Sequence, residues 1–193
     1  MLVKSVLIEK REIKMKNELT NEERLVEIKK YWLKRKSMIN DENANKLNEL
    51  EIFKDKVAFE FKDGWNDLIY ELGKDIEDLC KLANCELPLI QQIKEKFGTL
   101  RFYYNTLNSQ YPKIIEKSIR ALVSQAENRS STICEQCGKF GETRVDGGLY
   151  KTVCKEHQGS SITVFEYEEM MKKHYEERRR AKEEAEQKIR DIK

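Results

Sequence analysis

Two short motifs in the C-terminal half constrain the fold of this chain more than any other feature. Cys134 and Cys137 form a C-x2-C pair, and Cys154 and His157 form a C-x2-H pair, with sixteen residues between the pairs. A two-residue gap lets a tight turn present two ligands to one metal ion, and a hairpin between the pairs brings up the other two. Because Zn²⁺ prefers four sulfur and nitrogen ligands at tetrahedral corners, this spacing predicts one zinc ion per chain.

The predicted zinc site is structural rather than catalytic. Four protein ligands close the coordination shell, whereas a catalytic zinc keeps one position open for water. Gly138 directly follows the second cysteine and fits a knuckle, since the backbone amides there bend towards the sulfur. Between the pairs, the segments TRV and LYKTV flank Asp146, Gly147 and Gly148, which predicts a hairpin with a tight turn.

Composition favours helices. Charged residues make up 37% and there are only 8 Gly and 2 Pro, so helix formers outnumber helix breakers. Lys and Arg (37) nearly balance Asp and Glu (35), so the chain lacks the strong net positive charge that is typical of nucleic-acid-binding proteins. We therefore expect a predominantly helical α+β protein: a compact helical core, a short aromatic strand or hairpin, a zinc knuckle of ribbon or treble-clef type, and a long charged C-terminal helix.

The N-terminal region shows no targeting segment. Its first apolar run is broken by Lys4, and no stretch of the chain is apolar for long enough to cross a membrane. We expect a cytoplasmic protein with reduced thiols, in which Cys80 and Cys85 are core or surface residues. Residues 1–19 are predicted to be a flexible leader. Met15 is the hypothetical native start, because the codons for EKRE would provide a purine-rich ribosome-binding sequence.

Residues 20–60 are predicted to form an N-terminal helical segment. Thr20 and Glu23 form a capping box, and the stripe that begins at Leu25 and Ile28 predicts a helix over residues 21–36. A weaker helix is indicated around Leu47, Leu50 and Val57. The alternation in VAFEF leaves a short strand over residues 57–61 open as an alternative.

Residues 61–158 are predicted to form the α+β core. An amphipathic helix runs from Trp65 to Leu79 with Asp63 as its cap, and Pro112 begins a later helix. TLRFYY alternates as a half-buried strand, with Leu100, Phe102 and Tyr104 on one face and Arg101 and Tyr103 on the other.

A further helix is predicted to begin at Pro88 and to end at Gly98. Its inward-facing residues would be Ile90, Ile93 and Phe97. Trp65, Phe97 and Phe102 are expected to pack together as the core against which the knuckle docks.

Residues 159–193 are predicted to form the charged C-terminal helix. Its charges alternate in sign and no heptad repeat is sustained, so a coiled coil is not favoured. One interpretation is a solvated helix held by ion pairs. The other is a partner-binding helix whose apolar contacts are Phe165, Tyr167, Met170 and Met171.

Four segments together resemble a known family. GWNDLIYEL, QQIKEKFGTLRFYY, AENRSSTICEQCG and YKTVCKEH are similar to the corresponding blocks of a family of small zinc-knuckle proteins of bacteriophages and prophages. The resemblance covers residues 63–157, and the block over residues 94–104 is its most specific part. It implies a phage setting and a zinc-bound α+β core, and it implies no activity.

Nothing in the sequence predicts an enzyme: no phosphate-binding glycine loop, serine elbow, paired His/carboxylate motif or kinase signature is present. The leading hypothesis is a non-enzymatic binding protein whose helical ends engage a host or phage protein. In a phage setting, inhibition of a host defence system is the role this suggests. A third hypothesis, ranked last, is an enzyme with no recognisable motif. The second is a nucleic-acid-binding accessory protein, although KFGTLRFYY lacks the spacing of an RNP motif. Its candidate residues are Lys94, Lys96, Arg101, Arg129 and Arg144.

Overall fold

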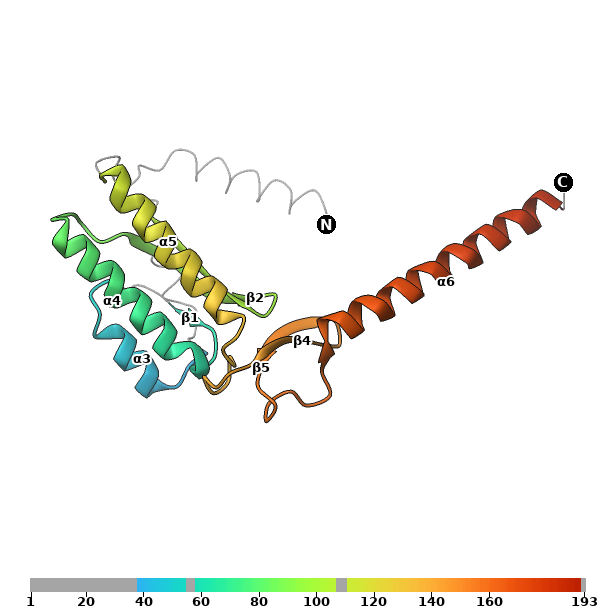
Figure 1. The fold of residues 1–193 in the computed structure, drawn as a ribbon, viewed down its shortest axis with the longest axis horizontal. Helices are drawn as coiled ribbons and strands as arrows, with labels where there is room; N and C mark the ends of the chain where they lie inside the picture. Colours follow the sequence, from blue (N-terminus) through green and yellow to red (C-terminus); the bar gives the residue numbers. More distant parts are fainter. Residues whose placement is uncertain (1–37, 55–57, 107–110, 192–193) are drawn as a thin grey trace, which may run out of the picture.

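The computed structural model describes residues 38–54, 58–106 and 111–191. Within these ranges the chain forms helices and two small three-stranded sheets, so the predicted α+β class is confirmed (Figure 1). In chain order the elements are α3 (Asp41–Asn48), β1 (Phe59–Glu60), the 3-10 helix η1 (Asp63–Trp65), α4 (Asn66–Leu82), β2 (Leu89–Lys96), β3 (Thr99–Asn105), α5 (Lys113–Ser130), β4 (Glu142–Asp146), β5 (Leu149–Val153), β6 (Ile162–Thr163) and α6 (Val164–Asp191).

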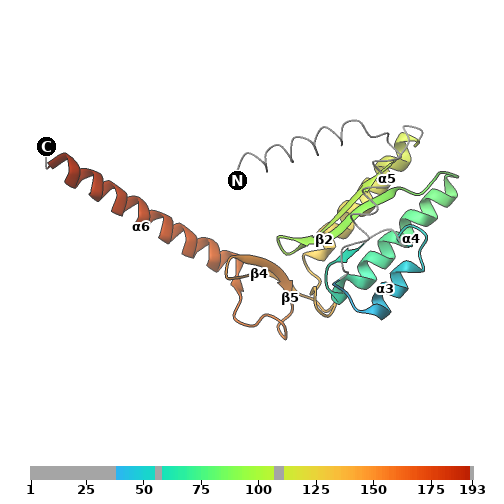
Figure 2. The same cartoon turned by 180° about the vertical axis from the view of Figure 1, so that it is seen from behind.

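The first sheet has the order β1-β2-β3 and carries the main core. β1 runs parallel to β2, and β2 runs antiparallel to β3. Helices α4 and α5 lie side by side against this sheet (Figures 1 and 2). Leu100 and Phe102 of β3 are buried, as the alternation of TLRFYY predicted. The helix predicted after Pro112 is confirmed as α5, which buries Ile119 and Ala126.

The segment after Pro88 is strand β2, so the helix predicted there is wrong. Ile93 of β2 lies opposite Phe102 of β3 in an antiparallel ladder. Ile90 and Ile93 are both buried although they are three residues apart, because the register shifts between Ile90 and Gln92. A bulge of this kind interrupts the alternation of a strand. It therefore produced the three-residue spacing on which the helix prediction rested.

Phe97 does not belong to the core, which corrects the predicted trio. Trp65 and Phe102 lie in one buried cluster, whereas Phe97 is 65% exposed. Phe97 and Gly98 have φ values of 56° and 75° and form the tight turn between β2 and β3. Gly98 thus belongs to a hairpin turn and does not end a helix.

The amphipathic helix is confirmed as α4, but Asp63 does not cap it. Asp63 begins the 3-10 helix that precedes α4. Its carboxylate instead accepts hydrogen bonds from the backbone N–H of Asn40 (2.9 Å) and the side-chain amide of Asn43 (2.7 Å). These bonds tie the start of α3 to the start of α4. The buried residues of α4 are Asn66, Leu68, Ile69, Leu72, Gly73, Ile76 and Cys80.

The N-terminal expectations fall partly within the described residues. The weak helix around Leu47 and Leu50 is the eight-residue α3, which the side chain of Asn40 caps. Strand β1 occupies Phe59–Glu60, part of the strand proposed over 57–61, while Val57 lies outside the described residues. The leader over 1–19, the start at Met15 and the helix over 21–36 also lie outside them.

The second sheet has the order β5-β4-β6 and leads into α6. β4 and β5 form the predicted hairpin, with Gly147 and Gly148 at φ values of 56° and 86° in its turn. β6 adds to the other edge of β4, where Ile162 lies opposite Val145. The chain passes from β6 directly into α6, so the base of the long helix is fixed to this small sheet.

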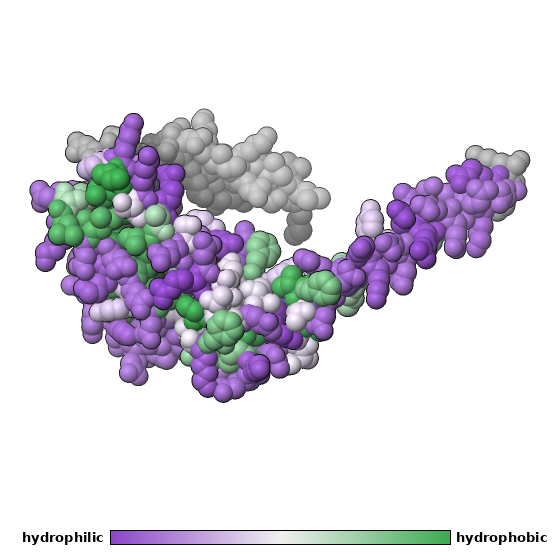
Figure 3. Space-filling model, in the orientation of Figure 1, coloured by the Kyte–Doolittle hydropathy of each residue, from purple (hydrophilic) through white to green (hydrophobic). Residues whose placement is uncertain are grey.

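Helix α6 is the predicted charged C-terminal helix, and none of its 28 residues is buried. It extends away from the rest of the molecule (Figures 1 and 2). Figure 3 shows a mostly hydrophilic surface along the helix, with apolar side chains gathered near its base. Across the described ranges, no helix is long and apolar enough to cross a membrane.

Candidate metal centre

The structure brings the four predicted ligands together. The ligand atoms of Cys134, Cys137, Cys154 and His157 all lie within 4.8 Å of one another. We refer to these four residues as the Cys3His cluster. Cys134 and Cys154 are buried, His157 is half-buried and Cys137 is exposed. Cys80 and Cys85 lie elsewhere, in and beside the main core, as expected for non-ligand thiols.

The separations within the cluster suit a tetrahedral metal ion. Sγ of Cys137 lies 3.7 Å from Sγ of Cys154. Nδ1 of His157 lies 3.3 Å from Sγ of Cys154 and 3.5 Å from Sγ of Cys134. Thiolate bonds of ~2.3 Å to a tetrahedral ion place two sulfurs about 3.8 Å apart. A disulfide would need sulfurs about 2.05 Å apart, so the arrangement is consistent with a metal site and not with a disulfide.

Local backbone geometry explains how each pair reaches the site. Gly138 has a φ of 76°, a conformation that glycine adopts without the penalty of a side chain. Its N–H donates to the carbonyl of Cys134 (2.9 Å), and the N–H of Cys134 donates to the carbonyl of Lys139 (2.8 Å). The second pair is held by a tighter turn, in which the N–H of His157 donates to the carbonyl of Cys154 three residues earlier (3.0 Å).

Hydrogen bonds also join the two halves of the cluster. The N–H of Glu135 donates to the carbonyl of Thr152 on β5, over 3.0 Å. On the outside, Nζ of Lys139 lies 2.7 Å from a carboxylate oxygen of Glu156. Because the β4–β5 hairpin connects the two pairs, a metal ion bound here would hold both ends of the hairpin together.

The thiols of the cluster differ in how readily they ionise. A hydrogen bond from the backbone N–H of Lys139 lowers the pKa of Cys137, but burial and the neighbouring Cys134 and Cys154 thiols outweigh it and raise that pKa. Burial opposes ionisation of the Cys154 thiol, but hydrogen bonds from the backbone N–H of His157 and from the Cys137 thiol lower its pKa to about 7. Cys154 therefore supplies a thiolate, the form that a metal ion requires, near neutral pH. Burial raises the pKa of Glu135, and Lys62, 4.0 Å away, partly offsets that effect.

Gly64 and Trp65 dock the cluster onto the main core, a role that the sequence predicted for Trp65 but not for Gly64. The N–H of Gly64 donates to the carbonyl of Glu135 (2.8 Å), and Nε1 of Trp65 donates to the carbonyl of Ile133 (2.8 Å). A Cβ at position 64 would lie 2.5 Å from the backbone nitrogen of Gly138 and 2.6 Å from that of Cys137. In the sequence, the signal that could have indicated this docking contact is the adjacent Gly and Trp of GWNDLIYEL.

Gly64→Ala should therefore separate docking from metal binding. The added methyl group meets backbone atoms that cannot rotate away, and such overpacking destabilises a protein by about 1–3 kcal/mol. We expect a melting temperature lower by about 2–12 °C for a chain of this size, with metal content unchanged because no ligand is altered. Thermal denaturation followed by circular dichroism, together with metal analysis, measures both.

Gly147→Ala is the matched control, because nothing lies within 4 Å of the Cβ it would add. Its positive φ alone should lower stability by about 1 kcal/mol. If Gly64→Ala had no larger effect than this control, the close docking of the knuckle on Gly64 would be disproved.

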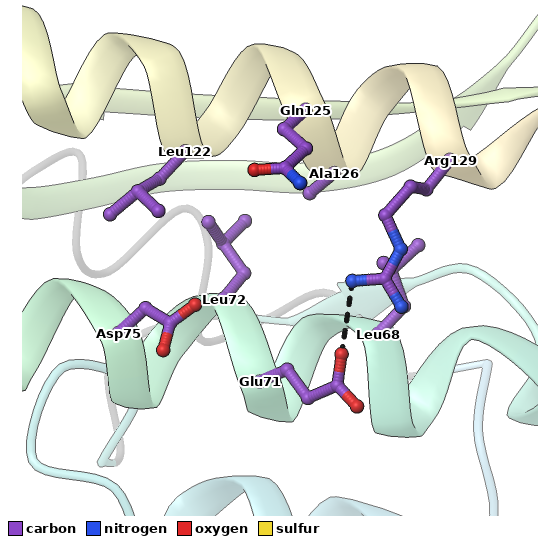
Figure 4. Close-up of a pocket in the computed structure, with 8 residues that line it drawn as sticks. All are labelled: Leu68, Glu71, Leu72, Asp75, Leu122, Gln125, Ala126 and Arg129. Atoms are coloured by element: carbon purple, nitrogen blue, oxygen red, sulfur yellow. Dashed lines mark hydrogen bonds and ion pairs between the residues drawn. The ribbon is translucent and has the colours of Figure 1, made fainter.

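The five predicted nucleic-acid residues do not form one surface. Arg129 lies in a hollow between α4 and α5, where its guanidinium pairs with Glu71 at 3.0 Å (Figure 4). Arg144 lies in the second sheet, pairs with Glu142 and donates to the carbonyl of Ser161. The remaining three, Lys94, Lys96 and Arg101, lie together on strands β2 and β3.

The predicted partner-binding residues all lie in the first turns of α6. Phe165 is 72% exposed, and Met170 and Met171 are also exposed. Tyr167 is half-buried because its ring packs against Tyr150 of β5, with centroids 6.1 Å apart.

No family model, curated protein or solved structure matches this chain.

Proposed function

We propose that this is a non-enzymatic, zinc-stabilised binding protein in which α6 engages another protein. The observation that carries the proposal is the combination of a closed Cys3His cluster with a 28-residue helix of which no residue is buried. The cluster would stabilise the small sheet on which the helix is mounted. The helix would supply the binding surface.

The ligand set favours zinc. Three thiols and one imidazole are soft and borderline ligands, which Zn²⁺ accepts in tetrahedral structural sites. With four protein ligands, no position is left for a reacting water molecule. A small hairpin module of this kind has too little apolar surface to fold by burial alone, so metal binding would supply much of its stability.

The properties of α6 support a role in docking. Its i,i+4 ion pairs, Arg179–Glu183 at 3.6 Å and Lys182–Glu186 at 3.8 Å, are each worth only about 0.3–0.5 kcal/mol. Tertiary packing supplies most of the stability of ordinary protein helices, whereas no residue of α6 is fully buried and its packing on the second sheet lies near its base, where Tyr167 contacts Tyr150. A partner that covered part of α6 would provide that packing.

The base of α6 is the part best suited to a partner. Thr163 and Glu166 cap the helix reciprocally: the Glu166 carboxylate accepts from the N–H of Thr163 (2.8 Å), and the Thr163 hydroxyl accepts from the N–H of Glu166 (3.1 Å). Beside this cap, Tyr167 and Met170 line a hollow together with residues of β4 and its turn. Methionine adapts its shape to varied apolar partners.

The biological setting within this proposal comes from the sequence resemblance to phage and prophage proteins. A phage protein of this design would act in the host cytoplasm on a host or phage partner. Inhibition of a host defence system is one consequence that such binding would have.

Truncation of α6 tests the proposal. A chain that ends at Thr163 keeps β6 paired with β4 and loses the whole helix. We expect it to remain folded and to bind zinc, because no described core residue lies in α6. It should no longer retain a partner that the full chain retains from cells carrying the phage, as judged by affinity capture and mass spectrometry.

Two point-variant chains sharpen this test. Met170→Ser with Met171→Ser removes exposed apolar contacts at the base of α6, whereas Ala181→Ser with Ala185→Ser changes the distal part of the helix. Loss of the partner in the first chain only would place the binding surface at the base. Full partner retention by the chain that ends at Thr163 would contradict the proposal and reduce α6 to a solvated appendage.

A further inference from the structure

One face of the first sheet carries a cluster of cations and aromatic rings that core packing does not explain. On β3, Leu100 and Phe102 are buried, and the alternating residues Arg101 and Tyr103 point to the opposite face. Tyr103 is 40% exposed. The register places Lys94 of β2 directly opposite Arg101 and Gln92 directly opposite Tyr103. These residues therefore share one surface of the sheet.

Two like charges lie side by side on this surface. Lys94 and Arg101 are cross-strand partners, and like charges placed directly opposite each other destabilise a sheet. Across the described ranges, no ion pair joins Lys94, Lys96 or Arg101 to a carboxylate. On the other side of β2, Glu60 of β1 lies in register with Lys94. Its carboxylate accepts hydrogen bonds from the side chain of Gln92 at 3.1 and 3.3 Å. An anionic ligand would relieve the repulsion.

Arg101 is also held in place. Its Nη1 atom donates to the hydroxyl of Thr99 and to the carbonyl of Leu100, both at 2.7 Å. A guanidinium has five N–H donors in a planar fork, so the others remain for a further acceptor. The side chain thus loses less freedom on binding an anion than a mobile surface arginine would.

Aromatic rings accompany these cations. Nζ of Lys94 lies 5.5 Å from the ring centroid of Tyr103, and Nζ of Lys96 lies 5.3 Å from that of Phe97. Phe97 occupies the tip of the β2–β3 turn with a φ of 56°, a position at which bulky residues are rare and asparagine or glycine is usual. The ring packs edge-on against Tyr150 of β5, with centroids 6.3 Å apart, and most of its surface remains exposed.

From this arrangement we propose that the Lys94–Tyr103 face binds single-stranded nucleic acid. Lys94, Lys96 and Arg101 would contact phosphates, and Tyr103 and Phe97 would stack on bases. Rows of cations beside exposed aromatic rings are how proteins bind single strands without sequence preference. The bases of a duplex are already stacked on one another, so these rings favour a single strand. The three cations lie on the first sheet, and the site approaches α6 at Phe97, since the ring of Tyr150 contacts both Phe97 and Tyr167. The proposal goes beyond the function proposed above.

The test is fluorescence anisotropy with the full-length, zinc-loaded protein. The probes are labelled oligo(dT) and oligo(U) of about 20 nucleotides, with a DNA duplex of the same length, and the salt is raised from about 50 to about 200 mM. Both single strands should bind more tightly than the duplex. Three phosphate contacts predict a salt slope of about −2 and hence an affinity loss of about twentyfold over this range.

Three variants make the proposal falsifiable. Lys94→Gln with Arg101→Gln should reduce the slope to about −0.7, and Tyr103→Ala should weaken single-strand binding about tenfold. Lys113→Gln with Lys117→Gln removes the same charge from exposed positions on α5 and should change neither quantity. The melting temperature and zinc content of each variant establish that it is folded.

Three results would overturn the proposal. The first is the absence of single-strand binding by the wild-type chain at the lowest salt concentration. The second is equal loss of affinity in the β2–β3 variant and in its α5 control. The third is that the chain binds no oligonucleotide but captures a protein, and that this capture is lost when Lys94 and Arg101 are substituted. That result would assign this face to a protein partner. A chain that ends at Thr163 should keep its oligonucleotide affinity, so failure of the α6 proposal is distinguishable from failure of this one.

Discussion

Purified protein should contain close to one zinc ion per chain, and Cys137→Ser should release it. A single complete Cys3His cluster exists in the described residues, and removal of one ligand leaves a three-ligand site that loses its ion to a chelator. Cys137 is exposed, so the serine disturbs no core packing and the effect reports on the metal. Metal binding contributes about 10–16 kcal/mol in isolated zinc-finger peptides. We therefore expect residues 132–157 to become sensitive to proteolysis. Elemental analysis and limited proteolysis measure the two effects.

Cys80→Ser is the matched control for the zinc prediction. Cys80 is buried in α4 and belongs to the main core, so the substitution perturbs packing but removes no predicted ligand. Zinc content should stay at one per chain. Equal zinc loss in the two variants would mean that the ligands are wrongly assigned, and iron in place of zinc would contradict the identity of the ion.

The second large effect is expected at Phe102, in the centre of the main core. Its ring centroid lies 6.2 Å from that of Phe53 and 6.3 Å from that of Tyr104. Truncation of a buried phenylalanine to alanine costs about 3–5 kcal/mol, since apolar contacts are lost and a cavity remains. We expect Phe102→Ala to lower the melting temperature by about 6–20 °C in a domain of this size. Thermal denaturation followed by circular dichroism measures the shift.

Tyr103→Ala provides the control for Phe102→Ala, because the neighbouring side chain points to the opposite face of the same strand. Tyr103 is half-exposed and outside the buried cluster, so its loss should change the melting temperature by a few degrees at most. Similar melting shifts in the two variants would contradict the assignment of one residue to the core and the other to the surface.

The sequence by itself determined the features that depend on neighbouring residues. The two ligand pairs, the Gly147 and Gly148 turn and the long charged helix were all predicted and are present. Each follows from local chemistry: a C-x2-C turn brings two thiols together, consecutive glycines adopt positive φ, and a run of helix formers remains helical.

Tertiary structure alone decided how distant segments meet. The bulge beside Ile90 exists only because β2 pairs with β3, so the spacing of apolar residues in β2 predicted a helix incorrectly. Phe97 became a surface residue because its hairpin places it at the turn, next to Tyr150 of the second sheet. Gly64 contacts the knuckle backbone from a position about 70 residues earlier in the chain.

The same reason separates the basic residues that the sequence grouped together. Arg129 pairs with Glu71, 58 residues away in sequence, and Arg144 is bound within the second sheet. Lys94 and Arg101 were brought into direct register by strand pairing. Charge and side-chain type are properties of a residue, but whether a cation is neutralised or left beside another cation depends on contacts between segments far apart in the chain. For this reason the sequence identified the four residues of the Cys3His cluster, and only the folded structure separated an arginine that links two helices from one that lies beside a lysine on the first sheet.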